Sequence, residues 1–124
     1  MPEKSFPFYT VLHLRFKLRV QPDVLLAHAQ EAAHKIASVE GLIWKIWLLQ
    51  QDGREIGGTY LFANRETAVA YLNHPVIQVL CSNPAVVSVD SQIWEVEISL
   101  SALTRAPLHQ IHTEEPEALI AGGR

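Results

Sequence analysis

Residues 41–62 are apolar on both faces of a predicted β-hairpin, and this constrains the fold more than any other feature. The first strand reads Gly41-Leu-Ile-Trp-Lys-Ile-Trp-Leu-Leu, and after Gln-Gln-Asp-Gly-Arg the second contains Ile56-Gly-Gly-Thr-Tyr-Leu-Phe. A half-exposed antiparallel strand alternates apolar and polar residues so that one face meets water. Here the apolar residues divide between both faces, with Leu42, Trp44, Ile46 and Leu48 on one and Ile43, Trp47 and Leu49 on the other. Only Lys45 interrupts, so the sheet needs a cover on each face.

The turn residues predict the register of this hairpin. Asp52-Gly53 is typical of a two-residue type I′ turn. Such a turn places Leu49 opposite Ile56, Trp47 opposite Gly58, Lys45 opposite Tyr60 and Ile43 opposite Phe62. The Trp47 indole would then cover the bare backbone of Gly58, while the Gly57-Gly58 pair also permits close approach of a ligand or another backbone.

The remaining chain predicts two strands and two helical regions around the hairpin. Residues 9–20 alternate, with Leu12, Leu14, Phe16 and Leu18 on one face and Val11, His13, Arg15 and Lys17 on the other. Pro22 opens a helix with an apolar stripe that ends before Gly41. Asn64 caps a helix over 65–72 whose inward residues are Val69 and Leu72, and Asn73-His74-Pro75 separates it from a short helix over 75–81. A last strand runs from Val86 to Leu100.

The order strand, helix, strand, strand, helix, strand predicts a ferredoxin-like βαββαβ domain of the α+β class. Such a domain has a four-stranded antiparallel sheet with two helices on one face. The helix-free face would expose roughly 600–800 Å², more apolar surface than monomers expose and about what one partner buries in a stable interface. We therefore expect a homodimer that packs through the helix-free sheet face.

Composition limits the other classes of protein. The chain has 124 residues, a formal net charge of −3 and no Lys/Arg cluster, so we expect no nucleic-acid partner. Its apolar runs are too short to cross a membrane, and its first residues lack a signal-peptide pattern. A single cysteine, Cys81, fits a reducing compartment. We expect its side chain to be buried as an apolar filler. We expect a cytoplasmic protein with one domain over residues 1–105. Residues 106–124 lose periodicity and are expected to form a C-terminal tail, either without order or lying across a partner.

The hairpin carries a resemblance to a known family. Gly41-Leu-Ile-Trp-Lys-Ile-Trp, the later Gly57-Gly-Thr-Tyr-Leu-Phe and Ala70-Tyr-Leu resemble the YdhR-type monooxygenases of the dimeric α+β barrel superfamily. The opening and final strands also fit, so the resemblance covers about residues 9–105. It implies pairing as a dimeric α+β barrel, with a ligand cavity between the sheet and the helices of each subunit.

The resemblance implies a cofactor-independent monooxygenase that uses O₂ on a small aromatic or phenolic substrate. Such enzymes deprotonate the substrate, and the electron-rich anion then reacts with O₂, without metal or flavin. We take Lys45, Tyr60 and His74 as candidate catalytic residues. Candidate substrate-binding residues are His13, Arg15, Trp44, Trp47 and Phe62. His13 or His74 is a candidate to accept the substrate proton, and Lys45 or Arg15 is a candidate to stabilise the anion. Lys45 is also a candidate to lower the pKa of the Tyr60 phenol.

Other interpretations stay open. The same dimer fits a non-catalytic module that either binds a small hydrophobic or aromatic molecule or serves as an interaction module. The tryptophans would then be packing residues and His74 a helix terminator. Haem binding or degradation is a third interpretation and needs an axial ligand such as His74. His109, His112 and Glu114 have ligand-like composition, but their spacing is weak evidence for a metal, and none is expected.

Overall fold

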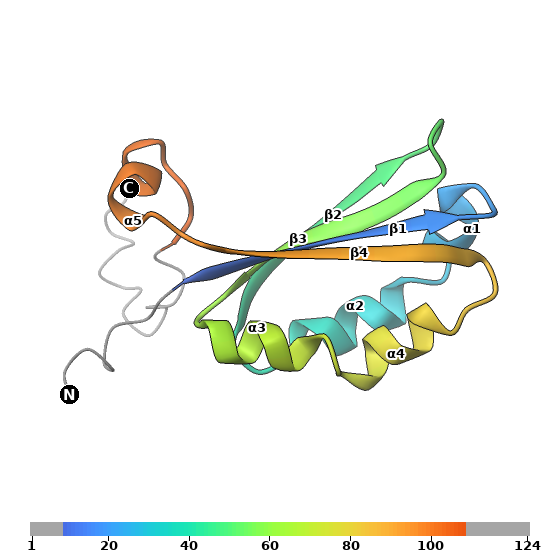
Figure 1. Cartoon of the computed structure of the whole chain (residues 1–124), viewed down its shortest axis with the longest axis horizontal. Coiled ribbons are helices and arrows are strands. Elements are labelled where there is room, and N and C mark those ends of the chain that lie inside the picture. The colour runs from blue at the N-terminus through green and yellow to red at the C-terminus, as the bar shows by residue number, and fades with distance from the viewer. Residues whose placement is uncertain (1–8, 109–124) are drawn as a thin grey trace.

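The computed structural model describes residues 9–108 as a twisted sheet with helices on one side (Figure 1). The strands are β1 (Thr10–Leu18), β2 (Leu42–Gln50), β3 (Glu55–Phe62) and β4 (Val86–Glu95), all antiparallel in the order β2-β3-β1-β4. The helices α2 (Gln30–Ala37), α3 (Arg65–Tyr71) and α4 (Pro75–Cys81) cover one face. The short helices α1 (Pro22–Leu26) and α5 (Ile98–Leu103) lie at opposite ends of the sheet. The predicted ferredoxin-like α+β fold is confirmed.

The core lies between the sheet and this helix layer. Its strand residues come from alternate positions of β1, as the sequence predicts, and from Tyr60 and Phe62 of β3. The helices contribute Ile36, Ala68, Tyr71 and Ile77. On α3 the buried residues are Ala68 and Tyr71. Of the two residues predicted to point inward, Leu72 packs against the core and Val69 is exposed, so the prediction was wrong for Val69.

The helix termini confirm two sequence signals. The Asn64 side chain accepts a hydrogen bond of 2.8 Å from the backbone N–H of Thr67 and caps α3. Gly41 joins the helix layer to β2 with φ of +85°, a conformation that favours glycine. A Cβ at this position would also collide with the Thr67 side chain, so no other residue fits this connection without strain.

The hairpin register agrees with the prediction for three of the four pairs. Leu49 faces Ile56, Trp47 faces Gly58 and Lys45 faces Tyr60. A bulge between Leu42 and Trp44 then shifts β2 by one residue, so that Leu42 rather than Ile43 faces Phe62 and joins the core. The turn also differs from type I′: its residue with positive φ is Arg54 (53°), which ends a four-residue loop between the paired residues 50 and 55.

Three other expectations were wrong. The first helix is interrupted at residues 27–29, where the sequence contains neither Gly nor Pro. The last strand ends at Glu95, and the apolar residues after it form α5, which the Glu97 side chain caps by accepting from the Leu100 N–H. Cys81 is exposed rather than buried.

None of the helices in residues 9–108 is long and apolar enough to span a membrane.

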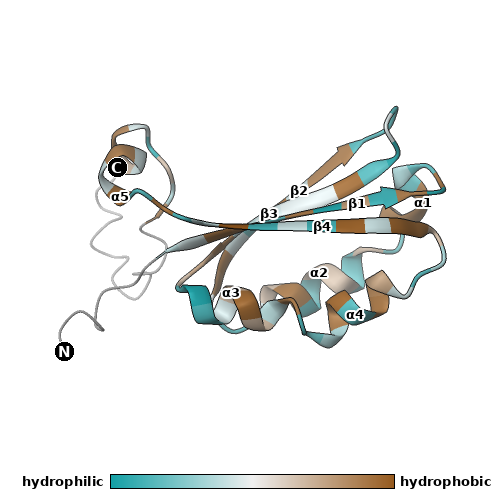
Figure 2. Cartoon of the chain, viewed as in Figure 1, coloured by the Kyte–Doolittle hydropathy of each residue, from teal (hydrophilic) through white to brown (hydrophobic). Residues whose placement is uncertain are grey.

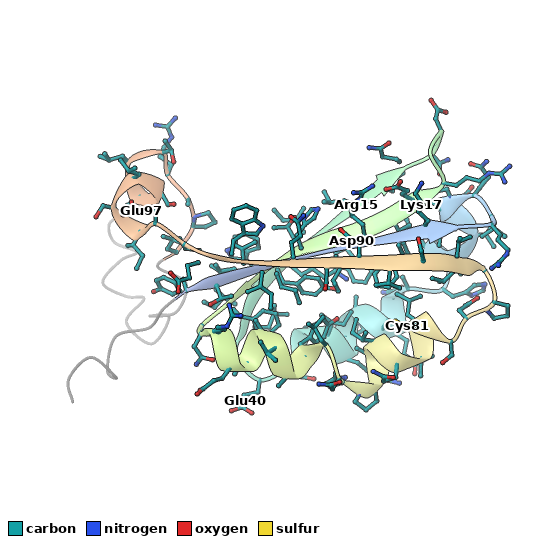
Figure 3. The ribbon with its side chains drawn as sticks, viewed as in Figure 1. Arg15, Lys17, Glu40, Cys81, Asp90 and Glu97 are labelled. Carbon is teal, nitrogen blue, oxygen red and sulfur yellow. The ribbon has the colours of Figure 1, made fainter. Side chains whose placement is uncertain are left out.

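The helix-free face is apolar along β2 and polar across the centre. Figure 2 shows brown, hydrophobic residues over much of β2, of which Ile46 and Leu48 are exposed on this face, together with Trp94 of β4. Arg15 and Lys17 point away from the helix layer (Figure 3), and both lie within 4.0 Å of the Glu55 carboxylate. The face is therefore more polar at its centre than the hairpin sequence alone suggests.

Near α5 this face is covered by the end of the described chain. Leu108 is buried with Tyr9 and Leu61, and Trp44 Nε1 donates a hydrogen bond of 3.1 Å to the Pro107 carbonyl. Residues 106–108 thus pack on the sheet, and the rest of the expected tail, including His109, His112 and Glu114, lies outside the described residues.

Candidate functional site

A cavity of about 490 Å³ lies between the helix layer and the sheet. This volume is within the range of small-molecule sites in proteins. Its walls are mostly apolar and come from β1, β2, β3, the helices α1, α2 and α4, and Tyr71 of α3. Polar and titratable groups also line it. The strands and the helices α3 and α4 contribute Lys45, Tyr60, Tyr71 and His74, and α2 with the segment before it contributes His28, Glu31 and Lys35.

Lys45 is the central polar group of this cavity. Its Nζ lies 3.3 Å from the centroid of the Trp47 ring and 4.7 Å from that of Tyr60. No carboxylate in residues 9–108 forms an ion pair with it; the ion pairs there involve Arg15, Lys17 and Lys35. Burial lowers the pKa of Lys45 from 10.5 to about 7, because the apolar surroundings disfavour the ammonium. Near neutral pH this site therefore holds a free amine in a large fraction of molecules.

Gly58 makes room for this amine. A Cβ at Gly58 would lie 2.6 Å from Lys45 Cε and 3.2 Å from Tyr60 Cε1, both closer than ordinary contact. The missing side chain thus leaves the space that the Lys45 stem crosses to reach the aromatic rings. The prediction that the Trp47 indole lies over Gly58 identified the correct cross-strand pair, but the side chain in contact with the glycine is that of Lys45.

Tyr60 and Tyr71 form a buried phenol pair. The Tyr71 hydroxyl donates a hydrogen bond of 3.2 Å to the Tyr60 oxygen, and their ring centroids lie 5.0 Å apart. Because the Tyr60 oxygen accepts this bond, its own O–H remains available as a donor. Burial raises the pKa of Tyr60, and the neighbouring Tyr71 raises it further. The hypothesis that Lys45 lowers this pKa was therefore wrong, and Tyr60 is a neutral hydrogen-bond donor.

His74 caps α4 with its imidazole. Its Nδ1 accepts a hydrogen bond of 3.1 Å from the Val76 N–H, and Pro75 occupies the first helical position. A neutral imidazole whose Nδ1 accepts carries its proton on Nε2. His74 thus presents a donor, and taking up a second proton at Nδ1 would break the cap. The Nδ1 atom of His74 is therefore not free to accept a proton while the cap is intact.

The structure separates the sequence-predicted residues into three groups. Lys45, Trp47, Tyr60 and His74 all line the cavity. Phe62 lies in the core behind it, with its ring 6.1 Å from Tyr60. The other three residues are on the helix-free face, where their contacts are with that face: His13 Nδ1 lies 3.0 Å from Thr59 Oγ1, Arg15 pairs with Glu55, and Trp44 bonds to Pro107.

Tyr71 lines the cavity but was not predicted as a site residue. The residue was not among the predicted inward residues of α3, and it was noted only as part of Ala70-Tyr-Leu in the family resemblance. The spacing of Ala68, Tyr71 and Leu72 along one face of a helix is the signal that would have found it. Within residues 9–108 no group of three or more His, Cys, Asp or Glu is arranged to hold a metal ion.

Comparison with known proteins identifies the family. Residues 11–107 match the family model described as "Putative mono-oxygenase ydhR". The chain belongs to the ydhR family. Comparison of the ydhR-family chain with curated proteins gives no match.

Solved structures share the fold of this ydhR-family chain at low sequence identity. SnoaB from Streptomyces nogalater, titled a cofactor-independent oxygenase, is 13% identical with a TM-score of 0.59, covering 74% of this chain and 96% of that one. A protein from Nitrosomonas europaea titled "Putative antibiotic biosynthesis monooxygenase" is 10% identical with a TM-score of 0.60, covering 75% and 94%. The heme-degrader MhuD from Mycobacterium tuberculosis is 16% identical with a TM-score of 0.55, covering 73% and 97%.

Proposed function

We propose that this protein is a cofactor-independent monooxygenase that oxidises a small aromatic or phenolic substrate with O₂. The observation that carries the proposal is the Lys45 amine, whose pKa burial lowers to about 7 inside an apolar cavity beside aromatic rings. A general base works best when its pKa lies near the working pH. Membership of the ydhR family supports oxygenation as the reaction, and the fold shared with an oxygenase is compatible with it.

In the proposed reaction Lys45 takes the substrate proton and then stabilises the anion. The neutral amine accepts the phenolic proton, and the resulting ammonium stays beside the phenolate. Tyr60 donates a hydrogen bond to the same oxygen, and the Trp47 indole offers a face for the substrate ring. Desolvation in the apolar cavity strengthens both interactions.

The anion then supplies the electrons that reduce O₂. Oxidation of a phenol to a quinone consumes one O₂: one oxygen atom enters the ring as the new carbonyl, and the other leaves as water with the two hydrogens lost by the substrate. Both electrons that the second oxygen atom needs come from the substrate, so the balance requires no further reductant. The role of the protein is to bind, deprotonate and orient the ring.

Oxygen uptake with a panel of phenols and anthrones tests this proposal. We expect turnover by chelator-treated protein, formation of quinone, and a loss of roughly 10²–10⁴-fold in Lys45→Met. Lys45→Arg separates the two roles, because arginine keeps the positive charge but cannot act as a base. Lys17→Met, on the opposite face of the sheet, is the matched control and should retain activity. A panel that binds but is never converted would contradict the enzyme and leave the binding module as the function.

Haem chemistry is a weaker candidate on the geometry of His74. A metal-bound imidazole normally donates a hydrogen bond from its other nitrogen, whereas Nδ1 of His74 accepts one from the Val76 N–H. Ligation through Nε2 would place two N–H groups against each other and cost α4 its cap. We therefore expect a haem titration to show no Soret shift that depends on His74.

We also propose that the chain forms a homodimer through the helix-free face, with Ile46, Leu48 and Trp94 in the contact. Their exposure on one face supports a second copy as its cover. Sedimentation equilibrium should give a dimer at micromolar concentration, and Leu48→Glu should give a monomer; a monomeric parent protein would contradict this. The cytoplasmic location stays a prediction.

A further inference from the structure

We infer that Lys45 is also a covalent capture site for small aldehydes and ketones, with which its amine forms an imine inside the cavity. This goes beyond the proposed function, because imine formation needs neither O₂ nor a phenolic substrate. The ligand class is a carbonyl compound with an apolar, preferably aromatic, body. Three features of the site support imine formation: the position of the Lys45 amine in the cavity, the absence of a carboxylate partner in residues 9–108, and the Tyr60 hydroxyl beside it.

The geometry places a reactive amine on the wall of a small-molecule cavity. Lys45 Nζ is held at the faces of Trp47 and Tyr60, and no carboxylate of the described chain pairs with it. A lysine without a counter-ion in an apolar pocket is the arrangement in which amines act as nucleophiles toward carbonyl groups. Gly58 contributes because it has no side chain to occupy the space in which the Lys45 stem lies.

The protonation state of the amine supports this geometry. Only the free amine attacks a carbonyl carbon, and an ordinary lysine with a pKa near 10.4 has roughly 0.04% free amine at pH 7. With its pKa lowered to about 7, Lys45 has about half of its molecules in this form. The gain in reactive species is on the order of a thousandfold, before the lower intrinsic nucleophilicity of a weaker base is counted.

The reaction balances without an oxidant or reductant. The amine lone pair attacks the carbonyl carbon, and the carbonyl oxygen gains a hydrogen bond from the Tyr60 O–H as its negative charge develops. A proton passes from nitrogen to this oxygen to give a carbinolamine. Water then leaves and the C=N bond forms, so that one amine and one carbonyl compound yield one imine and one water.

The chain contains its own comparison group at the rim of the same cavity. Lys35 also lines the cavity, but its side chain is 64% exposed and its Nζ lies 4.0 Å from the Glu31 carboxylate. Because this amine is exposed and paired, aldehyde that reacts by mere proximity has Lys35 as its target. The titratable groups that face Lys45 across the cavity are His28, Glu31 and Lys35 from the α1–α2 region, Tyr60 from β3, Tyr71 from α3 and His74 at the start of α4.

Reductive trapping tests the inference on the full-length protein. Benzaldehyde and sodium cyanoborohydride at pH 7 convert an imine to a stable benzyl amine, which peptide mass spectrometry locates. We expect Lys45 to be labelled at least tenfold faster than Lys35, and Lys45→Met to lose this label while the peptide containing Lys35 is unchanged. Gly58→Ala, which crowds the Lys45 stem, should slow labelling of Lys45 several-fold without affecting Lys35.

Two results would overturn the inference. One is labelling of Lys35 at a rate equal to or above that of Lys45 in the parent protein. The other is an unchanged cavity adduct in Lys45→Met. The test is independent of oxygenation: trapping at Lys45 without any oxygen uptake would contradict only the monooxygenase, and oxygen uptake without trapping would contradict only the capture site.

Discussion

Replacing Lys45 by methionine should make the protein more stable at low pH, although it removes the central polar group of the cavity. The physical reason is the cost of keeping an ammonium in apolar surroundings without a carboxylate partner in residues 9–108. Methionine has a similar length, no charge, and a sulfur that packs well against the Trp47 and Tyr60 rings. We therefore expect function and stability to oppose each other at this position.

The magnitude follows from the pKa of Lys45. The difference between 10.5 and about 7, at about 1.4 kcal/mol for each pH unit, sets a ceiling of roughly 5 kcal/mol. Contact of the ammonium with two aromatic faces and its partial access to water offset part of this cost. We expect Lys45→Met to raise the free energy of unfolding by about 2–3 kcal/mol at pH 6.

The pH dependence gives the prediction its sign. Between pH 7 and 10.5 the native state has released the Lys45 proton while the unfolded chain still holds it, so the parent protein gains stability as pH rises. The variant lacks this gain. Its advantage should thus be greatest below pH 7, fall to roughly half of that value by pH 9 and disappear only above pH 10.5.

Urea denaturation at pH 6 and pH 9, at one ionic strength, measures both effects. Lys35→Met is the matched control: it removes an exposed lysine from an i,i+4 pair, and we expect a change within about 0.5 kcal/mol at both pH values. A Lys45→Met protein that is less stable than the parent at pH 6 would contradict this prediction. So would a difference between the two proteins that stays constant from pH 6 to pH 9.

Three further predictions concern local structure. Asn64→Ala should lower the free energy of unfolding by about 1 kcal/mol in urea titrations, because the N-cap of α3 is lost; an unchanged value would show that this cap is not needed. Gly41→Ala should cost at least about 1–3 kcal/mol, through positive φ and collision with Thr67, which a thermal melt would show as a clear loss. Tyr71→Phe should cost about 1–2 kcal/mol in the same titrations, since the buried Tyr60 hydroxyl loses its donor; a neutral effect would argue against this hydrogen bond.

The fold could be predicted largely because local patterns agreed with one another. Alternation along β1, the Asn64 cap and the position of the hairpin turn each specify short-range structure, and together they define the ferredoxin-like order. The bulge at residues 42–44 was not predictable, because one extra residue in a strand that is apolar on both faces leaves the pattern unchanged. Residues 94–100 alternate in polarity like a strand, yet Ile98–Leu103 form a helix.

The site could be predicted only in part, since it depends on contacts between distant segments. The hairpin register brought Lys45 opposite Tyr60 from sequence alone. The sequence could not decide which face of an apolar hairpin the helices cover, and so candidates from both faces, such as Trp44 and Trp47, were grouped together. The loss of the Lys45 charge near neutral pH arises from burial by α2 and α4, which no local pattern reports.

The most direct test is an NMR titration of Lys45 in the folded protein. With ¹³C-labelled lysine, the Cε shift of each lysine follows its own protonation, and Lys45→Met identifies the signal. We expect a Lys45 midpoint near pH 7, well below the ordinary lysine value of about 10.4. A Lys45 midpoint near 10 would contradict both proposed roles of this lysine, because the cavity would then hold a permanent ammonium at neutral pH, unable to act as base or nucleophile.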